Sequence, residues 1–205
     1  LPQYSLVADE LEVFGGLHAL VYLAVFIPVA IFISTRRDAR SAYLYAFYLC
    51  CGIATLSKGL LGFALPGAII LAYILVTAEW RIVIEARIAS GIAIVALVTL
   101  PWHVAMWARH GMDWWREFFE QHHLNRISSG IHGDNLTGFD YFVRWGAYGA
   151  FPWVAFLPVA ASRFWKSLSP DSPERRAKVL VGVWMVVTFT LFTMSATKFH
   201  HYILP

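Results

Sequence analysis

Long apolar stretches alternate with short polar connections along most of this chain. Each stretch is about as long as an α-helix that crosses the hydrocarbon core of a bilayer, which is roughly 30 Å thick. The second stretch is short, and the start of the fourth is not sharply marked. The pattern predicts an all-α, polytopic bundle of about six transmembrane spans, near residues 14–34, 41–56, 60–77, 86–106, 142–161 and 178–195.

The composition supports a membrane protein. Hydrophobic residues make up 59% of the chain, aromatic residues 16% and charged residues only 14%. The mean hydropathy is +0.58. A water-soluble domain of this length does not need so much apolar surface. We therefore expect residues 1–205 to form part of one transmembrane domain.

The basic residues orient the predicted spans. Ten of the sixteen lysines and arginines fall in three connections, 35–40, 78–88 and 161–178, which are expected on the inner side of the membrane. Because these loops explain the net charge of +3, no nucleic-acid partner is inferred. The N-terminus, Lys58, the segment 107–141 and the C-terminal residues are then predicted on the outer side.

The predicted external loop 107–141 is longer than a simple connection requires. Within it, Asp113–Ile127 has the spacing of a helix with an aromatic side formed by Trp114, Trp115, Phe118 and Phe119. Indole rings favour the membrane interface, so this helix is expected to lie along the membrane surface. The loop is therefore a candidate functional element.

Two lysines at the ends of spans are candidates for binding an anion. Lys58 lies between two spans joined almost without a loop, and it either extends its ammonium group to the surface as an anchor or pairs with an anion. Lys198 directly follows the last span, and Tyr202 lies four residues later, on the same side of a helical turn. A cation beside a phenol suits a phosphate oxygen at the membrane surface. His200 and His201 lie between them.

The external loop carries further polar candidates. His122, His123 and Arg126 either form a solvated face or place Arg126, one turn beyond His122, against a lipid phosphate. His132 could bind a sugar hydroxyl or a metal ion. No cofactor is required by the sequence, and a divalent ion held by these histidines beside a carboxylate is an open alternative.

Several short motifs occur in an order that resembles one family of membrane enzymes. The chain from about residue 50 is similar to the central part of the bacterial ArnT-like and dolichyl-phosphate-mannose protein mannosyltransferase family, which has the GT-C fold. The motifs are Ser57-Lys58-Gly59, Leu65-Pro66-Gly67, Leu100-Pro101-Trp102, His110-Gly111, the loop 126–132 with Tyr141, Phe151-Pro152-Trp153, and Lys198 to Pro205.

The resemblance implies an integral membrane glycosyltransferase in the bacterial inner membrane, with its active face in the periplasm. Such an enzyme moves a sugar from a polyprenyl-phosphate donor to lipid A, a glycan or a protein. The residues implied to bind the donor phosphate are Lys58, Arg126, Lys198 and Tyr202. Those implied to line the substrate cavity are His122, His123, His132, Tyr141, His200 and His201.

The chain departs from the family in its acidic residues. Family members carry their catalytic carboxylates in a long first external loop, whereas here a span closely follows Asp9 and Glu10. We therefore expect the general base to lie outside this chain and the 205 residues alone to be inactive. The main alternative is a transporter or flippase that binds an anionic lipid without chemistry, and a structural membrane subunit is a third interpretation. The sugar, the acceptor and the oligomeric state cannot be read from the sequence.

Overall fold

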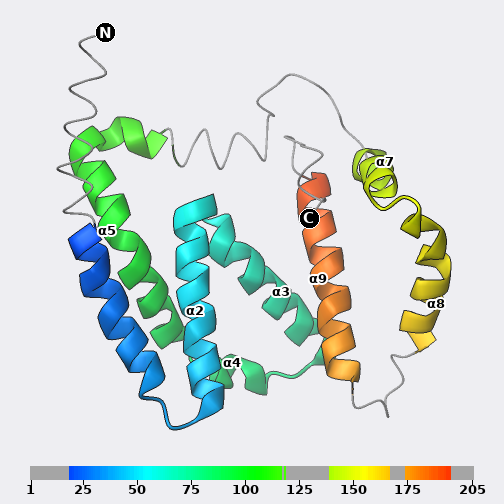
Figure 1. The fold of residues 1–205 in the computed structure, drawn as a ribbon, viewed down its shortest axis with the longest axis horizontal. Coiled ribbons are helices and arrows are strands. Elements are labelled where there is room, and N and C mark those ends of the chain that lie inside the picture. Colours follow the sequence, from blue (N-terminus) through cyan, green and yellow to red (C-terminus); the bar gives the residue numbers. More distant parts are fainter. Residues whose placement is uncertain (1–18, 117, 119–138, 167–173, 195–205) are drawn as a thin grey trace. The chain divides into compact units, whose positions relative to one another are not determined.

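The computed structural model describes residues 19–116, 118, 139–166 and 174–194, and all regular structure among them is helical. The chain divides into two units, which are described separately: unit 1 comprises residues 1–64 and 80–109, and unit 2 comprises residues 65–79 and 110–205. Figure 1 shows the helices. They are Ala19–Ser34, α2 (Ala39–Lys58), α3 (Leu61–Thr77), α4 (Arg81–Glu85), α5 (Ile88–Trp115), α7 (Phe139–Gly149), the 3₁₀ helix η2 (Trp153–Phe156), α8 (Leu157–Lys166) and α9 (Arg175–Met194).

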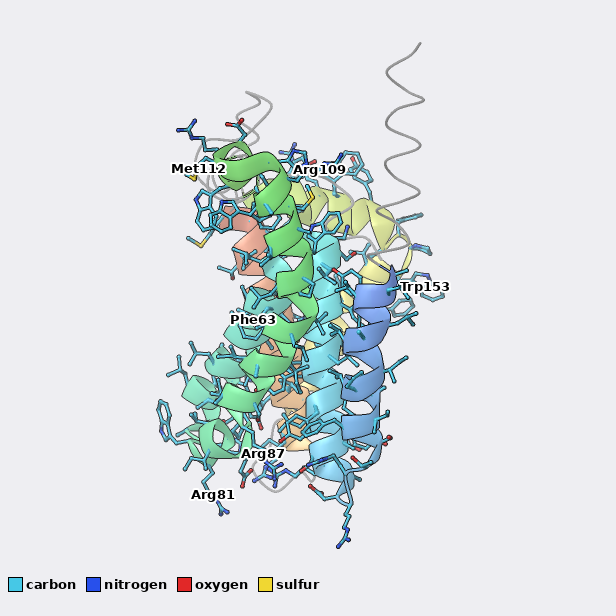
Figure 2. The ribbon with its side chains drawn as sticks, turned by 90° about the vertical axis from the view of Figure 1, so that its left-hand side faces the viewer. Phe63, Arg81, Arg87, Arg109, Met112 and Trp153 are labelled. Carbon is cyan, nitrogen blue, oxygen red and sulfur yellow. The ribbon has the colours of Figure 1, made fainter. Side chains whose placement is uncertain are left out.

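The core of unit 1 lies between three helices that run side by side, Ala19–Ser34, α2 and α5 (Figures 1 and 2). Aromatic and aliphatic side chains fill the space between these helices. Glycines allow close approach, because a Cβ at Gly52 would lie 3.0 Å from Cβ of Val98. The buried residues of this core are Val29, Tyr45, Tyr48, Cys51, Ile94 and Val95.

Local signals fix both ends of α2. Asp38 caps the N-terminus, since its carboxylate accepts hydrogen bonds from the backbone N–H groups of Arg40 and Ser41, each 3.0 Å long. Gly59 ends the helix with φ 71°, and its N–H donates to the Thr55 carbonyl at 2.9 Å. A left-handed φ favours glycine, so the Ser-Lys-Gly sequence ends this helix immediately after Lys58.

Unit 2 contains the larger part of α3 together with α7, η2, α8 and α9. Helices α8 and α9 pack closely at Gly182, where an added Cβ would lie 3.2 Å from the ring of Phe164. Near the start of α9, Arg176 forms an ion pair of 3.2 Å with Glu79. Phe142 of α7 is almost completely buried.

The apolar pattern predicted the helices well, with one exception. Five of the six predicted spans contain one helix each, and two of these helices, α5 and α9, are long and apolar enough to cross a membrane by length and composition. The helix Ala19–Ser34 and α3 are apolar but shorter. The number of helices that cross the membrane stays a prediction.

Residues 142–161, predicted as the fifth span, do not form one continuous helix. Helix α7 ends at Gly149, and η2 and α8 follow the Phe151-Pro152 sequence. Proline has no backbone N–H and disfavours helical backbone at the residue before it. An 11-residue helix is only about 16 Å long. The pattern missed this break because the segment remains apolar through it.

The predicted surface helix at 113–127 is described only at its start. Helix α5 is kinked at Gly111, where the backbone has the non-helical angles φ 58° and ψ −137°. The rings of Trp114 and Phe118 stack at 5.1 Å, in agreement with the predicted aromatic side. The remainder of this helix and most of the external loop lie outside the described residues.

Candidate functional site

Lys58 stands at a tightly built turn. It is the last residue of α2, and only Gly59 and Leu60 separate it from α3. The turn leaves no space for a side chain at Gly62, where a Cβ would lie 2.3 Å from the backbone of Ala54. The sequence therefore fixes the backbone that carries the lysine.

The Lys58 side chain is exposed, and it forms no hydrogen bond or ion pair with any residue that the structure describes. A cation at a helix C-terminus is favoured by the partial negative charge of the last carbonyl groups. The same position leaves the ammonium group available to an external anion. Lys58 therefore has the charge and the exposure that the predicted phosphate contact needs.

An aromatic hollow lies near the same end of α2. It has a volume of about 340 Å³ and is lined by Tyr22, Phe26, Leu56 and Trp102. Tyr22 and Phe26 stack with their ring centroids 5.8 Å apart. Such a surface suits a hydrocarbon chain or the apolar face of a sugar ring. The sequence interpretation missed this hollow, although the i, i+4 spacing of Tyr22 and Phe26 is a signal for a shared aromatic face.

Tyr141 is the other predicted site residue that the structure describes. It lies on α7 and is partly buried, with its ring 5.1 Å from that of Phe142 and 6.4 Å from that of Trp145. The fully buried Phe142 anchors this turn of the helix. Lys58 belongs to unit 1 and Tyr141 to unit 2. That Lys58 and Tyr141 belong to one site stays a prediction.

The other predicted site residues lie outside the described part of the chain, and their roles stay predictions. They are His122, His123, Arg126, His132, Lys198, His200, His201 and Tyr202.

Metal binding was left open by the sequence. Among residues 19–116, 118, 139–166 and 174–194, no group of three or more histidine, cysteine, aspartate or glutamate side chains could hold a metal ion. The predicted histidine ligands are not among these residues, so the question of a divalent ion is untested.

The fold matches a known class of membrane protein. The chain superimposes on the crystal structure of ArnT from Cupriavidus metallidurans bound to undecaprenyl phosphate with a TM-score of 0.67 and 26% sequence identity. The match covers 89% of this chain and 33% of that protein. The described helices therefore have the membrane fold of the GT-C class.

Sequence comparison points to the same branch of that class. The chain is 30% identical over 173 residues to the undecaprenyl phosphate-alpha-4-amino-4-deoxy-L-arabinose arabinosyl transferase of Enterobacter sp. (strain 638), covering 83% of this chain and 30% of that protein. It is 31% identical to the enzyme of the same name from Pseudomonas aeruginosa (strain LESB58), covering 82% and 29%. No protein-family model matches the chain.

These matches confirm the resemblance to the ArnT-like family that the ordered motifs predicted. The chain spans about a third of the length of these relatives.

Proposed function

We propose that this chain is part of an integral membrane glycosyltransferase that uses a polyprenyl-phosphate-linked sugar as donor. One observation carries the proposal. Both the sequence and the fold match ArnT, and the ArnT structure in question holds undecaprenyl phosphate. The apolar helices of the chain are consistent with a donor that enters from the membrane.

In the proposed reaction, an oxygen atom of the acceptor attacks C1 of the sugar. The bond between C1 and the phosphate oxygen breaks, and polyprenyl phosphate leaves with the bonding electrons. The acceptor proton passes to a carboxylate, which we place outside this chain. Negative charge therefore increases on the departing phosphate, where positive side chains stabilise the transition state.

Lys58 is the described residue best suited to hold that phosphate. Its exposed ammonium group has no partner among the described residues, and its backbone is fixed by the Gly59 and Gly62 turn. A hydrogen bond to a charged group contributes roughly 1.5–3 kcal/mol. Loss of the lysine should therefore reduce donor turnover about ten- to hundredfold.

The remaining assignments complete the proposed site. Arg126, Lys198 and Tyr202 contribute further contacts to the donor phosphate. The substrate cavity is lined by Tyr141, His122, His123, His132, His200 and His201. The aromatic hollow beside the end of α2 offers an apolar surface to the donor.

The proposed setting follows from the charge pattern and the relatives. The enzyme lies in the bacterial inner membrane with about six spans in this chain, and its active face is periplasmic. The relatives are named for an aminoarabinose donor, so a sugar of this kind is the first donor to test. Lipid A is the first acceptor to test, followed by a glycan or a protein.

The test is release of polyprenyl phosphate from a radiolabelled polyprenyl-phosphate sugar by the complete purified protein. Lys58→Ala should lower turnover about ten- to hundredfold, while Lys58→Arg should retain more activity because it keeps the charge. Lys166→Ala is the matched control, because Lys166 is an exposed lysine at the end of α8 and in a predicted inner connection.

Equal turnover in Lys58→Ala and wild type would refute the phosphate assignment. Transfer of intact donor across a bilayer without cleavage would refute the enzyme and favour the transporter.

A further inference from the structure

One end of unit 1 concentrates positive charge. The chain carries five arginines there, and only two carboxylates accompany them, Asp38 and Glu85. Figure 2 shows Arg81 and Arg87 at this end and Arg109 at the opposite end of the same unit. The arginines are Arg36, Arg37, Arg40, Arg81 and Arg87.

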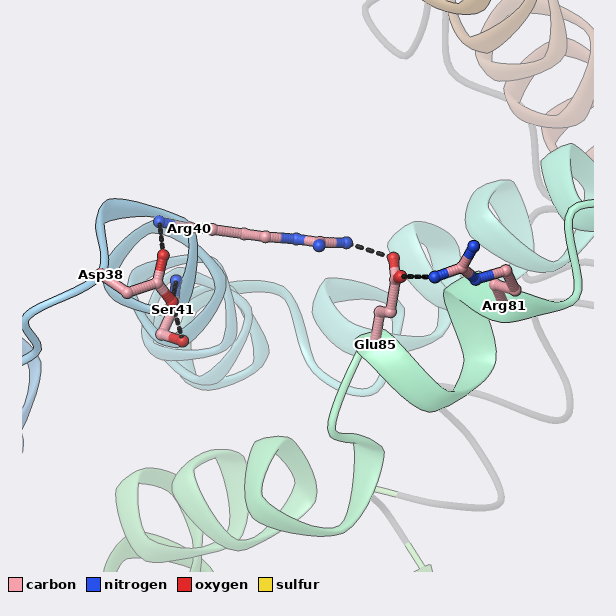
Figure 3. A network of polar contacts seen from close by, with 5 residues as sticks. All are labelled: Asp38, Arg40, Ser41, Arg81 and Glu85. Carbon is pink, nitrogen blue, oxygen red and sulfur yellow. Dashed lines mark hydrogen bonds and ion pairs between the residues drawn. The ribbon is translucent and has the colours of Figure 1, made fainter.

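Both carboxylates already have partners within the unit (Figure 3). Asp38 accepts hydrogen bonds from Arg40 N–H and from the N–H and hydroxyl of Ser41. Glu85 forms ion pairs with Arg40 and with Arg81, the latter at 3.7 Å. The Arg40–Glu85 pair links the start of α2 to α4, and both carboxylates at this end of the unit already have partners.

Three arginines remain without a salt bridge to any carboxylate among the described residues, namely Arg36, Arg37 and Arg87. Arg37 makes no hydrogen bond with the described residues either. Guanidinium groups do not lose their charge at physiological pH, so the charge of all three remains available to an external anion. The Asp38 carboxylate attracts Arg87 without forming a salt bridge with it.

Two of the three are already held in place. The Arg36 guanidinium lies 4.0 Å from the centroid of the Phe32 ring, and its Nε donates to the Phe32 carbonyl at 2.9 Å. Arg87 donates from Nη1 to the Tyr45 hydroxyl at 3.1 Å. A side chain that is already ordered loses less entropy when it binds a ligand. The terminal N–H groups of both remain suited to a phosphate, whose oxygens match the guanidinium fork.

Aromatic side chains mark the depth of this end in a bilayer. Trp80 is 58% exposed and Tyr43 is 78% exposed. Exposed indole and phenol rings favour the level of the lipid headgroups. Arg81 follows Trp80 in the chain, and Arg87 lies at the same end of unit 1 (Figure 2), so this end would lie at the phosphates of one leaflet.

We propose that Arg36, Arg37 and Arg87 form a binding surface for the phosphates of anionic phospholipids in the leaflet opposite the proposed active face. An anionic lipid is the expected ligand because of charge complementarity. The seven charged residues at this end carry a net charge of +3, and both carboxylates already have hydrogen-bond or ion-pair partners. This surface goes beyond the proposed function, because it needs neither the sugar donor nor Lys58. A purely topological role for these arginines predicts no headgroup preference.

The test measures lipid binding to the complete protein in detergent by native mass spectrometry, with phosphatidylglycerol or phosphatidylcholine and no sugar donor present. The Arg36→Gln/Arg37→Gln variant should weaken phosphatidylglycerol binding by about fivefold per arginine, roughly 25-fold in all. Phosphatidylcholine binding should not change. Arg37→Gln alone should weaken binding about fivefold, and it is the safer variant because that side chain has no hydrogen bond to any described residue.

The matched control is Arg163→Gln/Lys166→Gln, which removes two exposed basic residues of α8 in unit 2. It should change phosphatidylglycerol binding less than about twofold, within the small effect expected of scattered surface charges. Replacement of Arg36 and Arg37 by lysine should restore part of the affinity. Equal losses in the two glutamine pairs, or equal affinity of wild type for the two lipids, would overturn the proposal.

Discussion

A methyl group added at Gly91 would clash with the ring of Tyr48. The Cβ of an alanine there would be 2.2 Å from Cζ of Tyr48 and 2.3–2.4 Å from the two neighbouring ring carbons. Both residues are buried where α5 packs against α2. The clash involves a ring and not the flexible end of a side chain, so Gly91→Ala must move either the ring or a helix.

The magnitude follows from two contributions. Overpacking of a tightly packed core destabilises a protein by about 1–3 kcal/mol. Movement of the ring also breaks the hydrogen bond that the Tyr48 hydroxyl donates to the Ala86 carbonyl at 2.9 Å, which is worth about 1 kcal/mol. We therefore expect Gly91→Ala to lower the free energy of unfolding by about 2–4 kcal/mol.

The assay is thermal unfolding of the complete protein in detergent, followed by the fraction that remains monodisperse after heating. Gly67→Ala is the matched control, because Gly67 lies in α3 and is exposed, and no atom of the described residues lies within 4 Å of an added Cβ. Alanine stabilises a helix interior relative to glycine, so this control should retain or slightly raise the unfolding midpoint.

A Tyr48→Leu background tests whether the clash with the Tyr48 ring causes the loss of stability. In a Tyr48→Leu variant the ring is absent, and Gly91→Ala should then lower the unfolding midpoint much less than it does in the wild type. An unchanged midpoint for Gly91→Ala in the wild-type background would refute the close approach of α2 and α5. The same would follow if the loss were identical in the two backgrounds.

Three further predictions concern an ion pair, a helix cap and the kink in α5. Glu85→Gln should lower the free energy of unfolding of unit 1 by less than about 1 kcal/mol, because the Arg40 side chain of its ion pair is 70% exposed. Thermal unfolding measures the effect, and a larger loss would mean that the ion pair is shielded from solvent. Hydrogen bonds from Ser41 hold the pKa of Asp38 below its usual value. The carboxylate's contribution to the free energy of unfolding is therefore complete above about pH 4 and is lost as the pH falls through the lowered pKa. Asp38→Asn should keep the helix cap but lose this pH dependence. Gly111→Ala should destabilise α5 by about 1–3 kcal/mol through backbone strain, because φ at this residue is 58° and no described residue has an atom within 4 Å of the added Cβ. An unchanged melting temperature would contradict the positive φ at this position.

Helix existence could be predicted from the sequence because apolar length is a local property. The stretches 41–56, 60–77 and 178–195 correspond closely to α2, α3 and α9. The break within 142–161 could have been inferred from Pro152, but an apolar count gives a proline little weight. Pro66 and Pro101 lie inside α3 and α5 without ending them, so a proline alone does not decide the outcome.

The candidate site could be predicted only in part. Lys58 was identified from a short motif, and the structure explains its fixed backbone through the positions of Gly59 and Gly62. The aromatic hollow was not predicted, because its four lining residues come from three helices that are distant in the sequence. The ion pair between Arg40 and Glu85 could not be predicted either, because the two residues are 45 positions apart in the chain and meet only after the helices have packed.

The sequence by itself determined the helical class, the clustering of basic residues in three connections, the ends of α2 and the resemblance to ArnT-like enzymes, because each depends on residues close together in the chain. The tertiary structure decided which helices approach closely at Gly52 and Gly91, and it decided that Arg40 and Arg81 both pair with Glu85. These outcomes depend on side chains that meet only after the helices have packed, and no local pattern specifies them.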